Sequence, residues 1–156
     1  MEKSIKTVRK IKTALGGLMI LTTALSGMSA PVLAGQGGLI LSDPILRVII
    51  VSRPAAGYFS LENTGATTRV LVGAASPVCK KAMLHQSKMI NGVIKMLPIN
   101  ELPIKPGARL EFAPGGYHVM CMHPEKDIKS KTSVPLTLKF RNGDTLTGDF
   151  TVKGAR

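Results

Sequence analysis

The chain has 156 residues and a formal net charge of +12 at pH 7, with 21 Lys+Arg against 9 Asp+Glu. This length suits a single domain. The basic residues are scattered singly among apolar ones, and the chain has no Trp, 2 Tyr and 4 Phe. It therefore lacks the interleaved basic and aromatic residues of a nucleic-acid-binding surface, and we expect no nucleic-acid partner.

The first 34 residues differ in character from the rest and predict a secretory signal peptide. The basic stretch "MEKSIKTVRKIKT" precedes the apolar run "ALGGLMILTTALSGMSA" and two small residues, Val32 and Ala34, that suit cleavage after Ala34. That run is short and interrupted by glycine, serine and threonine, whereas a membrane-spanning helix needs ~20 predominantly apolar residues. The residue directly after the cut, Gly35, is not a cysteine, which argues against a lipid anchor there. We expect an exported, periplasmic mature domain of residues 35–156 without a membrane span.

Short β-branched segments follow one another through the mature chain, separated by turn-forming residues such as those of "RPAAG", "NTGATT", "APGG" and "NGD". Segments spaced by roughly ten residues, with no helical periodicity between them, predict an all-β antiparallel sandwich or barrel. The eight predicted strands are residues 46–51, 56–63, 69–76, 92–99, 108–113, 117–122, 134–140 and 145–153.

Two hairpins stand out. In "FRNGDTLTGDF", Asn142-Gly143 is expected to take the positive φ values that a tight turn requires. The preceding segment "VPLTLKF" alternates apolar and polar residues as a half-buried strand does. Upstream, "MLHQSKMINGVIKM" predicts a strand, a turn at Asn91-Gly92 and a second strand.

Every histidine and methionine of the mature chain falls within one third of its length. Elsewhere the apolar positions use Val, Leu, Ile and Phe, so gap-filling in the core does not explain this clustering. The residues are His85, His118 and His123, and Met83, Met89, Met96, Met120 and Met122.

Strand geometry groups four of these side chains. Alternate residues of a strand share a face, which places His118 and Met120 side by side with Cα atoms ~6.5–7 Å apart. Val119 and Cys121 then point the other way, into the barrel. The hairpin around Asn91-Gly92 brings His85 on its first arm near Met96 on its second.

Two neutral imidazoles and two thioethers make a soft donor set that suits Cu(I) rather than Mg²⁺, Ca²⁺ or Zn²⁺. The set as predicted lacks the thiolate of a blue-copper electron-transfer site. The sequence also shows no nucleophile elbow and no Ser-His-Asp order. We therefore expect a copper carrier and not an enzyme.

In this sequence His85 is followed by ten residues, Met96, twenty-one residues and then His118-Val119-Met120. With this spacing the chain resembles the periplasmic copper chaperones of the PCu(A)C family, and "AGYFSLENTG", "LVGAASP" and "SVPLTLKFRNGDTL" are similar too. The resemblance covers residues 39–153. It implies a cupredoxin-like Greek-key β-barrel, a single Cu(I) bound by His85, Met96, His118 and Met120, and copper delivery to the CuA site during cytochrome c oxidase assembly.

Cys79 and Cys121 leave three alternatives open. A disulfide between them suits an exported protein and would brace both halves of the site. Two buried, unpaired thiols are the second alternative. The third makes Cys121 an additional copper ligand, which its strand parity disfavours.

Two other functions stay open beside copper delivery. One is an exported β-sandwich interaction module whose methionine-rich patch docks a protein and binds no metal. The other is a scavenger of oxidants or copper without a dedicated acceptor.

Overall fold

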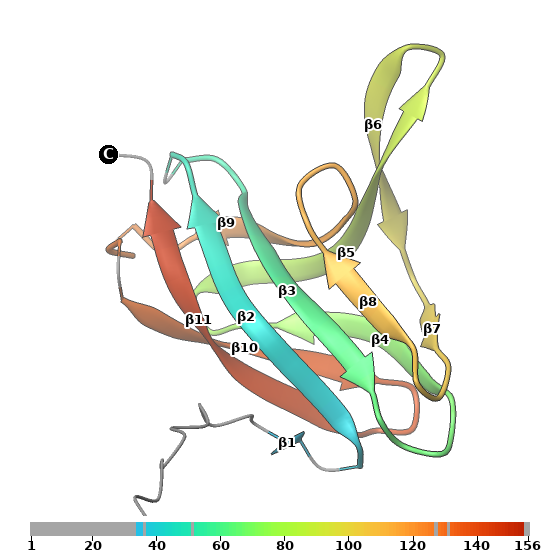
Figure 1. Cartoon of the computed structure of the whole chain (residues 1–156). Helices are drawn as coiled ribbons and strands as arrows, with labels where there is room; N and C mark the ends of the chain where they lie inside the picture. Colours follow the sequence, from blue (N-terminus) through green and yellow to red (C-terminus); the bar gives the residue numbers. More distant parts are fainter. Residues whose placement is uncertain (1–33, 36, 51, 127, 131, 155–156) are drawn as a thin grey trace, which may run out of the picture. The chain divides into compact units, whose positions relative to one another are not determined.

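The computed structural model describes residues 34–35, 37–50, 52–126, 128–130 and 132–154, and these fold as strands and connecting turns (Figure 1). They lie in a compact unit that spans Pro31–Arg156. The predicted signal peptide, residues 1–34, falls outside them apart from Ala34, so its cleavage stays a prediction. The described part of the chain contains no helix long and apolar enough to cross a membrane.

The strands of the described residues are labelled in chain order. They are β1 (Ala34–Gly35), β2 (Leu39–Val48), β3 (Ala55–Asn63), β4 (Arg69–Ala75), β5 (Cys79–Ile90), β6 (Val93–Ile99), β7 (Leu102–Ile104), β8 (Arg109–Phe112), β9 (Tyr117–Pro124), β10 (Ser133–Phe140) and β11 (Thr145–Gly154).

The strands close into a barrel. Hydrogen-bonded neighbours run in the order β5, β9, β8, β3, β2, β11, β10 and β4, and a β4–β5 pairing of Ala74 with Ala82 completes the ring. The pair β2–β11 is parallel, and most of the chain lies between its two strands, whereas β8 and β9 meet in parallel at one pair, Phe112 and Tyr117, on either side of a short connection. The all-β, cupredoxin-like Greek-key fold is confirmed, with a mixed sheet in place of a wholly antiparallel one.

Apolar side chains, at alternate positions of strands such as β10 and β11, fill this barrel. Phe59 lies at its centre, stacked on Phe112 with ring centroids 4.1 Å apart and in edge contact with Phe150 at 5.6 Å. Burying each large apolar side chain contributes about 1.5–3 kcal/mol. The alternation predicted for residues 134–140 is confirmed in β10, whose buried side chains are Val134, Leu136, Leu138 and Phe140.

The prediction for the first strand, residues 46–51, was wrong. β2 begins at Leu39 and ends at Val48, and it pairs with β3 on both sides of an irregularity between Ser42 and Ile45. Asp43 has φ 51° there and Pro44 follows it, so residues that usually mark a turn form a bulge inside one strand.

The connection between β10 and β11 also differs from the prediction. Residues 141–144 separate the strands, and Gly143 has φ 88° whereas Asn142 is not in the left-handed region. A four-residue connection does not need two consecutive positive φ values as a two-residue turn does. The Asn142 side chain instead donates a hydrogen bond to the Asp144 carboxylate, 2.8 Å.

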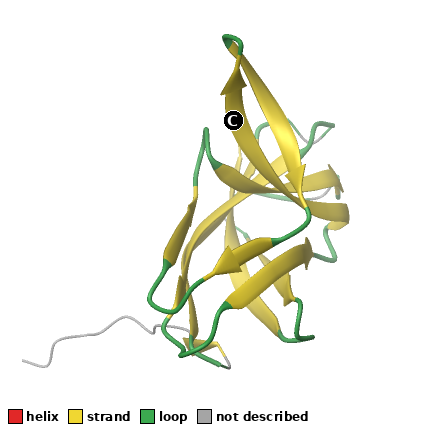
Figure 2. Cartoon of the chain, turned by 90° about the vertical axis from the view of Figure 1, so that its right-hand side faces the viewer, coloured by secondary structure: helices red, strands yellow, loops and turns green. Residues whose placement is uncertain are grey.

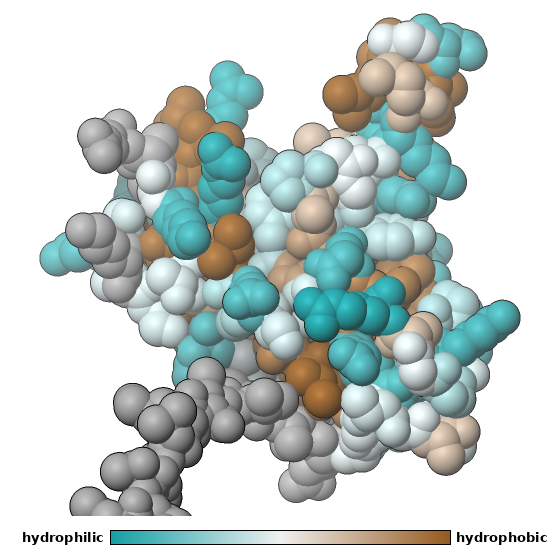
Figure 3. Space-filling model, viewed as in Figure 1, coloured by the Kyte–Doolittle hydropathy of each residue, from teal (hydrophilic) through white to brown (hydrophobic). Residues whose placement is uncertain are grey.

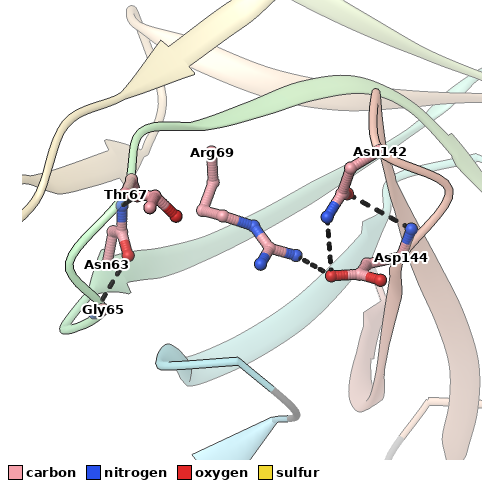
Figure 4. Close-up of polar contacts among 6 residues, drawn as sticks. All are labelled: Asn63, Gly65, Thr67, Arg69, Asn142 and Asp144. Atoms are coloured by element: carbon pink, nitrogen blue, oxygen red, sulfur yellow. Dashed lines mark hydrogen bonds and ion pairs between the residues drawn. The ribbon is translucent and has the colours of Figure 1, made fainter.

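Polar contacts hold the end of the barrel where the β3–β4 and β10–β11 connections meet (Figure 4). The fully buried Asn63 amide donates to the Thr67 carbonyl oxygen, 2.8 Å, and fixes the loop between them. Arg69, at the start of β4, forms an ion pair with Asp144 in the β10–β11 connection. Hydrogen bonds from Asn142 and Arg69 lower the pKa of the Asp144 carboxyl.

The β5–β6 hairpin projects from the barrel, as two perpendicular views show (Figures 1 and 2). Its turn is the predicted one, since Asn91 has φ 51° and Gly92 has φ 77°. The tip is hydrophobic (Figure 3), and the large apolar side chains that it exposes are Met89, Val93, Ile94 and Met96.

Candidate metal centre

The register of β5 and β9 sets the geometry of the site. The two strands are antiparallel neighbours, with His85 directly opposite His118 and Met83 directly opposite Met120. Directly opposed residues share a face, and their Cβ atoms lie about 4.5–5.5 Å apart. Because residues two apart on a strand also share a face, all four side chains occupy one patch of the sheet.

The two histidines face each other and are largely buried. Their ring centroids are 5.9 Å apart with an interplanar angle of 21°, and the exposed fractions are 8% for His85 and 4% for His118. On the reverse side of the sheet, Leu84 and Val119 are an opposed pair in the hydrophobic core. Packing of that pair therefore holds the two imidazoles in position.

Hydrogen bonding fixes which nitrogen of His118 is free. Its Nδ1 lies 3.2 Å from the Gly116 carbonyl oxygen, and a carbonyl only accepts, so Nδ1 carries the proton and Nε2 keeps its lone pair. Among the described residues, neither Nε2 of His118 nor Nδ1 of His85 has a hydrogen-bond partner, although both are buried. An unpaired buried polar group costs about 1–3 kcal/mol, so these nitrogens point to a missing ligand.

Burial also favours the neutral form of His118. Removal of the ring from water lowers the pKa of His118, and the neighbouring His85 lowers it further, against the opposing effect of the Gly116 carbonyl. A neutral imidazole is the form that binds a metal.

The thioethers predicted as ligands meet His118 at one hollow. A cavity of about 660 Å³ is lined by His118, Met96 and Met120, with Ile49, Ile50 and Ile94 among the apolar residues around it. Met96, on β6, lies opposite Ser87 of β5 and is 58% exposed. Thus three of the four predicted ligands share a cavity wall, and the fourth, His85, lies directly across from His118.

These residues fit a soft monovalent ion. No carboxylate belongs to the lining of the cavity, and imidazole with thioether is the donor set that suits Cu(I). Within the described residues, no three or more His, Cys, Asp and Glu side chains form a group that could hold a metal ion. His123 is exposed and lines a different hollow, beside Cys79 and Glu125.

A disulfide joins Cys79 on β5 to Cys121 on β9, with Cα atoms 5.3 Å apart. Of the three alternatives, the structure therefore has the bridge, and the readings of two free thiols and of Cys121 as a ligand were wrong. Cys121 is fully buried on the core side of β9, as its parity with Val119 predicts. The bond ties together the two strands that carry the histidines.

Residues 39–152 match the family described as "Putative lipoprotein LpqE-like". The chain belongs to the LpqE-like family. A curated relative, "Putative lipoprotein Lxx21020" of Leifsonia xyli subsp. xyli, is 32% identical over 91 residues, which cover 58% of this chain and 55% of the relative. The LpqE-like chain thus spans about half the length of that relative. The two cysteines of the present chain, Cys79 and Cys121, both belong to the disulfide.

Solved structures similar to this LpqE-like chain include PCuAC domains. The copper-bound PCuAC domain from PmoF2 is 23% identical with a TM-score of 0.62, covering 76% of this chain and 94% of that domain. The solution structure of Cu(I)-DR1885 from Deinococcus radiodurans is 30% identical with a TM-score of 0.52, covering 83% of each chain. The expected likeness to PCu(A)C proteins is therefore supported in the fold.

Met83 is one of the clustered side chains to which the sequence assigned no role, with Met89, Met122 and His123. The motif spacing counts forward from His85, whereas Met83 precedes it on the same strand. The sequence does contain a pattern that could have drawn attention to Met83. The order Met-x-His in Met83-Leu84-His85 of β5 is the reverse of the His-x-Met in His118-Val119-Met120 of β9.

Proposed function

We propose that the chain is an exported Cu(I) carrier that holds one cuprous ion as cargo between His85, Met96, His118 and Met120. The observation that supports this most strongly is the buried His85–His118 pair, which has an unpartnered nitrogen on each ring and thioethers beside it. The likeness to copper-bound PCuAC domains agrees with this cargo.

Each donor contributes something different to holding and releasing the ion. Strand pairing positions both imidazoles, and burial lowers the pKa of His118, which favours the neutral form that binds copper. The thioethers are uncharged, soft ligands. Met96 is the most exposed of the four donors, so an incoming ligand from another protein can replace it first. Such an arrangement suits a carrier rather than an enzyme.

We propose that delivery takes place outside the cytoplasm, to a copper-accepting protein such as the CuA subunit of cytochrome c oxidase or another periplasmic copper chaperone. The predicted signal peptide, residues 1–34, and the disulfide support export. The description of relatives as lipoproteins points the same way. The mature domain under this proposal is residues 35–156.

Anaerobic titration of residues 35–156 with Cu(I) against a chromophoric chelator tests the site. We expect a stoichiometry near one in the wild type and its loss in His118→Ala. His123→Ala is the matched control, because that histidine is exposed and lies outside the cavity. Equal binding by wild type and His118→Ala would refute the proposed site.

A transfer assay tests delivery separately from binding. Cu(I)-loaded protein is mixed under reductant with an apo CuA domain, and the acceptor is then isolated and its copper measured. Copper that stays with the carrier over a range of acceptor concentrations would contradict delivery to this class of acceptor while leaving copper binding intact.

The exposed hairpin tip favours a second candidate, an interaction module that binds no metal. Met89, Val93, Ile94 and Met96 present apolar surface to water, as docking surfaces do. The variant Met96→Ile distinguishes the two candidates, because it preserves apolar area but removes the sulfur. Loss of Cu(I) affinity in this variant supports the carrier, whereas unchanged function without copper supports the module.

A further inference from the structure

The Met-x-His of β5 and the His-x-Met of β9 pair in register, so that His85 faces His118 and Met83 faces Met120. The two strands thus form a rectangle of two imidazoles and two thioethers on one face of the sheet. Its short edges are cross-strand pairs, with Cβ atoms about 4.5–5.5 Å apart. Its long edges are i, i+2 pairs of ~6.5–7 Å.

Met83 is better placed on the sheet, relative to His118 and Met120, than Met96 is. Met83 belongs to β5, the immediate neighbour of β9, whereas Met96 belongs to β6, on the far side of β5. Neighbouring strands lie about 4.7–4.9 Å apart, so a β6 residue starts one strand further from β9. Met96 reaches the cavity from the projecting hairpin, but Met83 is held within the barrel wall.

Met83 is also open to solvent on its own side. It is half-buried and lines a separate hollow of about 330 Å³, together with Lys81, Pro98 and Asn100. Pro98 is the residue opposite His85 on β6. The hollow with Met96 and Met120 thus borders His118, whereas the hollow with Met83 borders Pro98, the cross-strand neighbour of His85.

We propose that Met83 is a further Cu(I) ligand, which replaces Met96 when the hairpin thioether leaves the ion. The inference rests on the proposed function. The ion then has two four-donor sets that share His85, His118 and Met120 and differ in one thioether. Exchange of Met96 for Met83 keeps the cargo coordinated while it exposes the Met96 side of the site to an acceptor's ligand.

Chelator competition on four variants of residues 35–156 tests this exchange: Met83→Leu, Met96→Leu, the double variant and Met89→Leu. Leu is close to Met in volume, so folding should be preserved, and thermal unfolding of each variant checks it. If the thioethers substitute for each other, each single ligand variant loses about tenfold or less in affinity, and the double variant loses more than about a hundredfold. Met89→Leu, a sulfur removed from the exposed hairpin outside both hollows, should match the wild type.

A spectroscopic measurement reports on the ligand directly. With ¹³C-labelled methionine methyl groups, addition of Cu(I) to Met96→Leu should shift the Met83 resonance, and the shift should vanish in Met96→Leu/His118→Ala. Met96→Leu losing as much affinity as the double variant, with a Met83 methyl that does not move, would overturn the inference. That outcome would leave wild-type Cu(I) binding untouched, whereas a wild type that binds no Cu(I) would refute the proposed function itself.

Discussion

The β5–β9 pair and the β5–β6 hairpin share one strand but differ in how much of their side chains is exposed to solvent. At His85 and Leu84, β5 is part of the barrel wall and exposes 8% and 2% of these side chains. Four residues after His85, Met89 is 66% exposed on the projecting hairpin. The same strand therefore carries one proposed ligand, His85, that is held by the core, and leads to another, Met96, that is held only by a hairpin.

The difference separates two requirements of the proposed carrier. Preorganised imidazoles, fixed by pairing, packing and the disulfide, supply affinity without ordering cost at binding. A donor on an exposed hairpin supplies a bond that breaks without disturbing the barrel, because segments with few buried contacts open locally at low cost.

The largest effect is expected from Leu84→Ala, which removes the core contact behind the histidines. Truncating a buried Leu costs about 2–5 kcal/mol, through lost transfer free energy and the cavity left behind. The free energy of unfolding, from urea titration, measures it. Ile94→Ala on the hairpin is the control, since an exposed substitution stays within about 0.5 kcal/mol. Similar losses in both variants would mean that the hairpin is as much a part of the core as β5 is.

The disulfide variant Cys79→Ala/Cys121→Ala should come next. The bond closes a loop with a sequence separation of 42 residues, and removing it frees the unfolded chain at a cost of about 2–4 kcal/mol. Thermal unfolding with and without reductant measures the change. Reductant should destabilise the wild type and leave the double variant as it is. A variant that reductant destabilises equally would show that the effect does not come from this bond.

A pH effect on the metal-free protein should follow from His118. Its folded-state pKa is lowered by burial, so the unfolded chain takes up a proton first as pH falls. The stabilisation is complete above the unfolded value of about 6.5 and is lost as pH falls below it, by at most about 1.4 kcal/mol per pH unit. Urea titrations between pH 7.5 and 5.5 measure the slope, which should flatten in His118→Gln. A slope that persists in this variant would assign the effect to another group.

Copper affinity should show the same competition with protons. Because imidazole binds a metal only when neutral, Cu(I) affinity should fall as pH drops through the histidine range of roughly 5–7. Chelator competition at several pH values, with a chelator calibrated at each, measures it. Affinity that stays flat from pH 8 to 5 would argue against histidine ligation.

Local pattern predicted those parts of the molecule that local chemistry determines. The alternation of Val134, Leu136 and Leu138 predicted β10, and Asn91-Gly92 predicted the hairpin turn, since period and positive φ are properties of neighbouring residues. The start of β2 was missed because Asp43-Pro44 is typical of a turn, and only pairing with β3 on both sides makes it a bulge.

The features of the site also divide into those that local pattern predicted and those that it could not predict. Strand parity predicted that His118 and Met120 share a face and that Cys121 points inward. The pairing of His85 with His118, the role of Cys79 and the placement of Met83 opposite Met120 all depend on the register between β5 and β9. Register is set by core packing across the barrel and not by the spacing of residues along the chain.

The smallest change in global stability is expected from Gly92→Ala at the hairpin tip. Gly92 has φ 77° with open space around it, so an added Cβ meets no neighbour but strains the backbone by about 1–2 kcal/mol. Local opening of the hairpin should relieve that strain, leaving the global free energy of unfolding within about 0.5 kcal/mol.

Gly143→Ala is the matched control for this substitution. Gly143 also has a positive φ, 88°, and open space around it, but it connects β10 to β11, whose side chains fill the core. Relief by local opening there would expose buried residues, so the strain should appear in global stability. Hydrogen exchange completes the test, with faster exchange of the hairpin amides in Gly92→Ala and unchanged exchange in β9. Equal global losses in the two variants would show that the hairpin and the barrel unfold as one unit, and that Met96 is held as firmly as His85.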